Sequence, residues 1–155
     1  MRLVDLRRFL VFQAFLLWQG GFLFYTAVVV PIGTDVLDAF TQGLVTRRVT
    51  DWLNLFGAVW AVAFAWDVMT CRDPNRRRRR ARWLAWAACV ALLAVLAWLH
   101  AKMDALIDLD ELALRDRPTF KTTHIGYLWA STAHWALGLV LGWLTLRAWR
   151  AEDRS

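Results

Sequence analysis

The stretch FLVFQAFLLWQGGFLFYTAVVV, residues 9–30, decides the class of this protein, because it holds 22 consecutive residues without a formal charge. An α-helix rises about 1.5 Å per residue, so roughly 20 apolar residues cross a hydrocarbon core about 30 Å thick. The chain has 155 residues, 59% of them hydrophobic, and gathers its apolar residues into four such runs. The other three cover residues 52–69, 83–100 and 124–146.

These four runs predict an all-α, integral membrane four-helix bundle that forms one transmembrane domain over residues 1–155. A helical protein with an apolar core in water would instead show polar faces repeating through each run, and these are absent. Arg2, Arg7 and Arg8 precede the first run in the manner of a signal peptide. However, the run is longer than the 7–15 residues typical of a signal peptide and no A-x-A-like site follows it, so we expect a retained helix.

The distribution of lysine and arginine predicts the orientation, since the basic connections of a membrane protein stay in the cytoplasm. Thirteen of the nineteen basic residues lie near the N-terminus, between the second and third runs, or near the C-terminus. The other two connections hold six. We therefore expect both termini to be cytoplasmic and the chain to lie in a bacterial inner membrane.

The two outer connections carry helical patterns of their own. Val36, Leu37, Phe40 and Leu44 predict a short interfacial helix in the first outer loop, before a cap at Thr50 and Asp51 opens the second span. In the second outer loop, the spacing of His100, Asp104, Asp108 and Glu111 places them on one helical face. The third helix is therefore predicted to extend beyond the membrane and to end before Pro118, with Thr122 or Thr123 capping the fourth.

A run of five arginines precedes the third span: Arg76, Arg77, Arg78, Arg79 and Arg80. Basic runs also occur in nuclear-import and nucleic-acid-binding segments. Here the run ends two residues before an apolar segment, where it would hold the connection inside and meet anionic lipid headgroups. We therefore interpret the formal net charge of +6 as topological, and expect no nucleic-acid partner.

Several polar residues interrupt the apolar runs. We expect a polar intramembrane site formed by residues from three helices: Gln19, Asn54, Tyr127, Ser131 and His134. Residues spaced by four along the fourth run, namely Gly126, Ala130, His134, Gly138 and Gly142, form a small-residue stripe that favours close helix packing. The polar groups are read either as interhelical hydrogen-bonding residues or, for His134 above all, as a functional group inside the membrane.

His100 and His124 end the third run and begin the fourth, so both are expected near the outer face. With Asp104 one turn beyond His100, they form a candidate zinc or copper(II) site. Two histidines on different helices are also a candidate pair of ligands for haem b. The identity of any cofactor stays open at this point.

Catalytic motifs are absent. The sequence holds no GxSxG, HExxH or P-loop pattern, and no CxxCH for covalent haem. We therefore favour a non-enzymatic protein that acts as a membrane-assembly subunit or homo-oligomer, or through its polar intramembrane site. The alternatives are a haem- or metal-binding redox protein and a small oligomeric transporter or channel.

Two motifs resemble a known family. WQGGFLFYTAVVVPIG carries Trp18, Gly20, Gly21 and Pro31, and FKTTHIGYLWASTAHW carries Phe120, His124, Ser131 and Thr132. Both are similar to stretches of small bacterial four-helix membrane proteins that form a domain of unknown function, distantly similar to eukaryotic TMEM-type proteins. The resemblance implies a four-helix membrane fold, supplies no activity, and favours His124 over His134 as a functional position.

Overall fold

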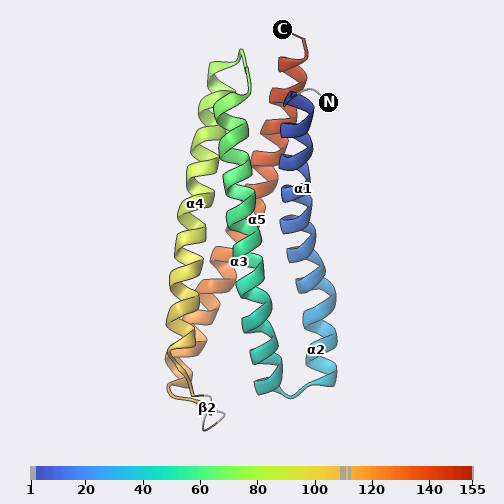
Figure 1. The fold of residues 1–155 in the computed structure, drawn as a ribbon. Helices are drawn as coiled ribbons and strands as arrows, with labels where there is room; N and C mark the ends of the chain where they lie inside the picture. Colours follow the sequence, from blue (N-terminus) through green and yellow to red (C-terminus); the bar gives the residue numbers. More distant parts are fainter. Residues whose placement is uncertain (1–2, 109–110, 112, 155) are drawn as a thin grey trace.

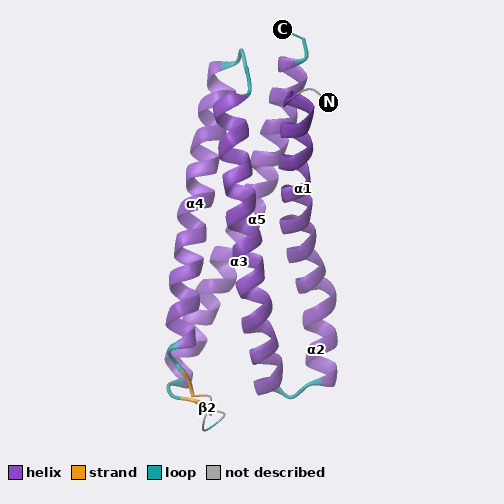
Figure 2. Ribbon diagram, viewed as in Figure 1, coloured by secondary structure: helices purple, strands orange, loops and turns teal. Residues whose placement is uncertain are grey.

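Four long helical segments run side by side in this computed structural model, which describes residues 3–108, 111 and 113–154. In chain order they are α1 (Leu3–Phe24) with its continuation, α3 (Ala39–Thr70), α4 (Arg76–Asp104) and α5 (Arg117–Glu152). Figure 1 shows the termini and the α3–α4 connection together at one end of the bundle, which we call the terminal end. The opposite end, called the hairpin end, holds the turn before α3 and a two-stranded hairpin (Figure 2). The described chain is all-α apart from this hairpin.

The first helical segment runs from Leu3 to Val36 without a break, but it changes geometry on the way. A π-helical turn, η1 (Tyr25–Val29), joins α1 to α2 (Val30–Val36). Pro31 lies just after this turn. A proline inside a helix has no N–H to donate and its ring pushes away the carbonyl four residues earlier, which is one recognised cause of such widening.

The predicted interfacial helix of the first outer loop is not a separate element, so that prediction is wrong. The turn between α2 and α3 is confined to Leu37 and Asp38, and α3 then continues through Thr50 and Asp51 to Thr70. Asp38 caps α3, because its Oδ1 accepts the N–H groups of Phe40 and Thr41, each at 3.0 Å. An aspartate at this position satisfies the free N–H groups of the first turn, so the helix starts twelve residues earlier than expected.

The third helix continues past residue 100, as predicted, but it does not reach Asp108 and Glu111, so its predicted length beyond the span is wrong. α4 ends at Asp104, and β1 (Ile107–Asp108) pairs antiparallel with β2 (Ala113–Leu114). The side chain of Asp108 accepts the N–H of Glu111 at 3.2 Å. Such local bonds to an aspartate compete with helix formation and favour a turn, which the period of charged residues does not reveal.

Both remaining helix starts lie earlier in the chain than predicted. Asn75 caps α4 through its bond to the N–H of Arg78, so the arginine run is the first part of the helix rather than a loop. Asp116, not Thr122 or Thr123, caps α5 by accepting the N–H of Thr119 at 3.1 Å. Pro118 follows in the first turn, where a missing N–H costs nothing.

Burial in the bundle is opposite to that of a protein folded in water. Val62 and Leu84 are each 72% exposed, while Asp67 and Arg82 are both 0% exposed. The buried core draws on all four long helices, with Trp18, Trp60, Phe64, Cys89 and Leu141 among its residues. Large apolar side chains thus cover the outside as well as the inside of the bundle.

Three of the four segments are long and apolar enough to cross a membrane: Leu3–Val36, Ala39–Thr70 and Arg76–Asp104. α5 is the longest single helix but does not qualify by composition, since its first half carries polar residues such as His124, Tyr127, Ser131 and His134. The described chain is therefore an all-α protein with three helices suited to a bilayer.

Close packing between α1 and α5 predicts the effect of adding one methyl group. A Cβ on Gly138 would lie 2.5 Å from Trp18 Cζ3 and 2.6 Å from Gln19 Nε2. Gly138→Ala is expected to destabilise the protein by about 1–3 kcal/mol, because the buried ring must move. Gly126→Ala is the matched control, as nothing lies within 4 Å of its Cβ. Unfolding in mild detergent, followed by tryptophan fluorescence, would measure both; equal midpoints would contradict the packing.

Candidate functional site

Polar side chains inside the bundle gather at three levels. At the terminal end lies a group of ion pairs around Asp67, which we call the charge network. At mid-height His134 and Gln19 lie among tryptophans in what we call the aromatic layer. Near the hairpin end, Asn54, His100 and Tyr127 belong to a third group, the hairpin-end cluster.

Asp67 of α3 is the centre of the charge network. Its carboxylate receives Arg82 of α4 in a fully buried ion pair, and Arg7 Nε of α1 lies 2.9 Å from its Oδ1. Trp149 Nε1 of α5 donates to the same Oδ1 at 2.9 Å. Arg82 Nε also donates to Thr145 Oγ1 of α5 at 3.2 Å. One buried carboxylate is thereby connected to all four long helices.

Glu152, near the end of α5, is the second acid of the network. Its Oε2 accepts Arg7 Nη2 at 2.6 Å and Arg8 Nη2 at 2.9 Å, while Oε1 accepts the backbone N–H of Arg72 at 2.9 Å. Burial alone would raise the pKa of this carboxyl. The hydrogen bonds from Arg72, Arg8 and Arg7 outweigh it and lower the pKa from 4.5 to about 2. Glu152 is therefore charged throughout the physiological range.

The aromatic layer surrounds His134, which is 3% exposed. The ring centroids of Trp18 and Trp60 stack at 4.3 Å, and that of His134 lies 4.6 Å from Trp18 and 5.9 Å from Trp60. Gly57 lets the rings approach, since a Cβ there would lie 3.2 Å from Trp18 Nε1 and 3.6 Å from His134 Cε1. These rings close the middle of the bundle.

Gln19 lies beside this layer and links α1 to α5 by donating to the carbonyl of Trp135 at 3.0 Å. Three buried polar atoms of the layer have no hydrogen-bond partner among the described residues: Gln19 Oε1, Trp60 Nε1 and His134 Nε2. An unpaired buried group costs about 1–3 kcal/mol. The charge network also holds buried atoms without a hydrogen-bond partner among the described residues, namely Arg7 Nε, Arg8 Nε and Arg82 Nη1, so neither level is fully hydrogen-bonded.

In the hairpin-end cluster, Tyr127 Oη lies 3.3 Å from its hydrogen-bond partner Asn54 Oδ1, which joins α5 to α3. His100 Nε2 of α4 lies 2.8 Å from Asp51 Oδ1 and 3.7 Å from Asp104 Oδ2. Arg47 Nε in turn lies 2.8 Å from Asp104 Oδ1. Charged and polar groups of three helices thus meet here in a partly exposed setting.

The residues of the expected polar intramembrane site do not form one group. Gln19 and His134 belong to the aromatic layer, and Asn54 and Tyr127 belong to the hairpin-end cluster. Ser131 is 7% exposed and lies on α5 one turn before His134 in the chain. The five residues are therefore distributed over two levels of the bundle.

The candidate cofactor residues have other neighbours. His124 is half-buried and stacks on Phe120 of its own helix, with centroids 6.1 Å apart and planes 8° apart. His100 is next to Asp51 and Asp104. Within residues 3–108, 111 and 113–154, no group of three or more His, Cys, Asp or Glu side chains could hold a metal ion. The structure thus does not gather His100, Asp104 and His124 into one three-ligand site.

The arginine run divides into one paired residue and four exposed ones. Arg78 binds Asp73 through two bonds of 2.7 and 2.5 Å, from Nε to Oδ2 and from Nη2 to Oδ1. This pairing raises the pKa of Arg78. It also links the α3–α4 connection to the first turn of α4. The exposed members are Arg76, Arg77, Arg79 and Arg80.

Sequence reasoning missed the charge network as a site. The available signal was Asp67, the one acid in residues 52–69, because a charge inside an apolar run is expensive and calls for a partner. Its partners are Arg7 of α1, Arg82 of α4 and Trp149 of α5, and no local spacing connects such distant positions.

No family model, curated protein or solved structure matches this chain. The resemblance to bacterial four-helix membrane proteins therefore has only its short motifs as support, and the site is interpreted from its own geometry.

Removal of the central carboxylate should be costly. Asp67→Ala leaves Arg82 buried without its partner, and breaking a buried ion pair in this way typically costs about 3–5 kcal/mol. Asp104→Ala removes the half-exposed partner of Arg47 and should cost about 0–1 kcal/mol. Thermal unfolding of both variants in detergent measures the difference; similar losses for the two would contradict the central role of Asp67.

The lowered pKa of Glu152 predicts an acid-sensitive contribution to stability. Since the folded pKa is about 2 and the ordinary one is 4.5, the charged carboxylate favours the folded state above pH 4.5. That contribution is lost as the pH falls from 4.5 towards 2. The unfolding midpoint should therefore drop less steeply over this range in Glu152→Gln than in the unaltered protein. Parallel pH profiles would show that the ion pairs of Glu152 do not stabilise the fold.

Proposed function

We propose that this chain is a four-span protein of the bacterial inner membrane that acts without catalysis, as a subunit of a membrane assembly. The observation that carries the proposal is the inverted burial, in which Asp67 and Arg82 are fully enclosed while Val62, Leu84 and Trp129 are each more than 70% exposed. An apolar exterior on this scale needs lipid as its solvent, since proteins in water rarely expose large contiguous apolar patches.

α5 is proposed as the fourth span, over residues 124–146. It packs against α4 along much of its length and also contacts α1. Its polar residues Ser131, His134 and Thr145 are buried, while Leu128, Val140 and Trp143 are 51–58% exposed. A membrane helix keeps its polar side chains towards its neighbours, so the burial pattern supports a span where average hydropathy is moderate.

The orientation follows from charge. The arginine run, Arg7, Arg8 and the basic residues of the α5 C-terminus all lie at the terminal end. The positive-inside rule then makes that end cytoplasmic and the hairpin end external. Exposed arginines at the terminal end would contact anionic headgroups, each worth about 1 kcal/mol near a charged membrane surface.

A structural role is favoured over transport or cofactor chemistry. Trp18, Trp60, Phe64 and Leu141 close the interior of a single chain, which argues against a water-filled path through one protomer. The acids of the charge network are paired to arginines and so serve to hold helices together. The separate surroundings of His100 and His124 give the haem and metal alternative no specific support. The exposed apolar side chains along the helices leave room for protein neighbours within the bilayer.

Single-cysteine labelling tests the span number and orientation. In a background with Cys71→Ser and Cys89→Ala, Glu111→Cys should react with a membrane-impermeant thiol reagent in intact cells. Arg154→Cys should react only after the membrane is permeabilised. Labelling of both sites in intact cells would mean that α5 does not cross the membrane, and labelling of Arg154→Cys alone would mean the opposite orientation. Recovery of the chain in the cytosolic fraction would overturn the proposal altogether.

A further inference from the structure

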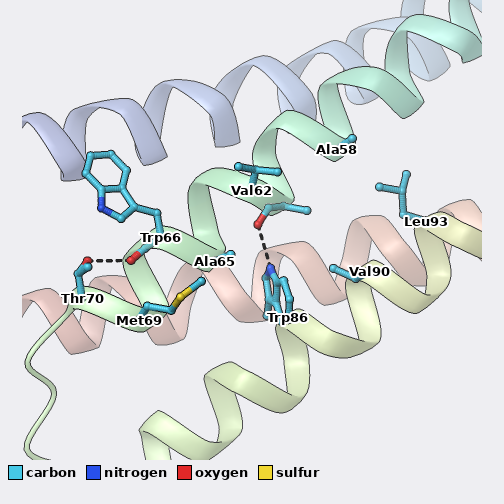
Figure 3. Close-up of a pocket in the computed structure, with 10 residues that line it drawn as sticks. Ala58, Val62, Ala65, Trp66, Met69, Thr70, Trp86, Val90 and Leu93 are labelled. Atoms are coloured by element: carbon cyan, nitrogen blue, oxygen red, sulfur yellow. Dashed lines mark hydrogen bonds between the residues drawn. The ribbon is translucent and has the colours of Figure 1, made fainter.

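An open apolar groove runs along the outside of the bundle between α3 and α4 (Figure 3). It has a volume of about 540 Å³ and is lined by Ala58, Ala65 and Met69 of α3 and by Trp86, Val90 and Leu93 of α4, among others. α3 contributes small side chains as well as Trp66 and Met69 to the lining. Because the groove lies on the exterior, whatever fills it comes from the surroundings of the bundle.

Two of the polar side chains that line the groove donate their hydrogen bonds to the protein itself. Trp86 Nε1 donates to the carbonyl of Ala61 at 2.9 Å, and Thr70 Oγ1 donates to the carbonyl of Trp66 at 2.7 Å. Both bonds are drawn in Figure 3. The Trp86 bond holds the indole against α3. The surface left for an occupant is hydrocarbon-like, so recognition within the groove rests on shape and apolar contact.

The length and position of the groove match one leaflet of a bilayer. From Ala58 to Thr70, α3 rises about 18 Å, given 1.5 Å per residue. Half of a hydrocarbon core about 30 Å thick is roughly 15 Å. The groove ends at Thr70, directly before the α3–α4 connection at the terminal end. It therefore begins at the membrane surface and reaches about to mid-membrane.

Two exposed arginines lie beyond the terminal end of the groove, Arg72 in the α3–α4 connection and Arg79 on α4. Arg72 follows Met69 by three residues, and Arg79 precedes Trp86 by seven, so Arg79 shares the face of α4 that lines the groove. Both arginines are exposed. Arg78, by contrast, is bound to Asp73. Two positively charged side chains thus lie next to an apolar groove whose length matches one leaflet.

We propose that this groove binds one anionic phospholipid, with an acyl chain between α3 and α4 and its phosphate at Arg72 and Arg79. The inference rests on the proposed membrane topology, which puts this end of the bundle at the cytoplasmic leaflet. Guanidinium groups form paired hydrogen bonds with phosphate oxygens, which suits them to a phosphodiester headgroup. A membrane helix from another protein is the competing occupant. Such a helix would cross both leaflets, whereas the groove extends over only one, and the test must distinguish the two occupants.

The test measures lipid retained by the purified protein. Protein reconstituted with equal amounts of phosphatidylglycerol and phosphatidylethanolamine, then extracted in mild detergent, is weighed intact by native mass spectrometry. Val90→Trp fills the groove, and Val95→Trp is its control, as Val95 is similarly exposed on α4 but outside the groove. Arg72→Gln with Arg79→Gln removes the two positive charges at the terminal end of the groove. Arg147→Gln with Arg150→Gln removes equal charge from exposed sites of α5.

The proposal expects one retained phosphatidylglycerol per chain in the unaltered protein and in both controls. Loss of two arginines should weaken retention roughly 30-fold, from about fivefold for each. Val90→Trp should abolish retention; should that variant misfold, the arginine pair and its control decide alone. Three results would overturn the proposal. These are equal lipid retention in all variants, equal loss of lipid in both arginine pairs, and loss of a dimer in Val90→Trp without loss of lipid.

Failure of this inference and failure of the proposed topology give different results. A chain that labels as a four-span protein but keeps no phosphatidylglycerol overturns the lipid site alone. A chain that is absent from the membrane fraction overturns both.

Discussion

The buried ion pair between Asp67 and Arg82 is the interaction on which the rest of the bundle depends. Neither side chain reaches the surroundings, and moving two charges out of water is so costly that only close pairing with further hydrogen bonds offsets it. Trp149 and Thr145 of α5 supply hydrogen bonds, and Arg7 of α1 adds a second ion pair to Asp67. All four helices must therefore meet at the depth of this ion pair. This requirement sets the position of each helix along its neighbours.

This constraint agrees with the proposal that lipid solvates the exterior. Inside a bilayer, apolar side chains gain little by packing on each other rather than on lipid tails, so polar groups and close contacts of small residues select the partners of each helix. The bundle has contacts of this kind at each of its three levels. They are the charge network at the terminal end, Gly57 and Gly138 against Trp18 in the middle, and Asn54 with Tyr127 towards the hairpin end. Specificity of assembly is thus distributed along the full length of the helices.

The predictability of these features depends on whether their cause is local. Apolar runs placed the four long helices correctly, because length and hydropathy are properties of each segment. Helix ends were predicted poorly at Asp38, Asp108 and Asp116, where a single side chain bonds to nearby N–H groups and decides between helix and turn. Gln19 and His134 were predicted as interior polar residues, yet their level relative to Asn54 and Tyr127 depends on helix rotation. Arg7, Asp67 and Arg82 are joined only by tertiary packing, so their network was not predicted.

A double-mutant cycle on Asp67 and Arg82, measured by unfolding in lipid bilayers, tests whether this ion pair organises the bundle. If the pair organises the bundle, Asp67→Asn and Arg82→Gln will each destabilise strongly. The double variant will then lose less than the sum of the two, with a coupling free energy above about 1 kcal/mol. Additive losses, within about 0.5 kcal/mol, would show that the two residues act independently and would contradict the account.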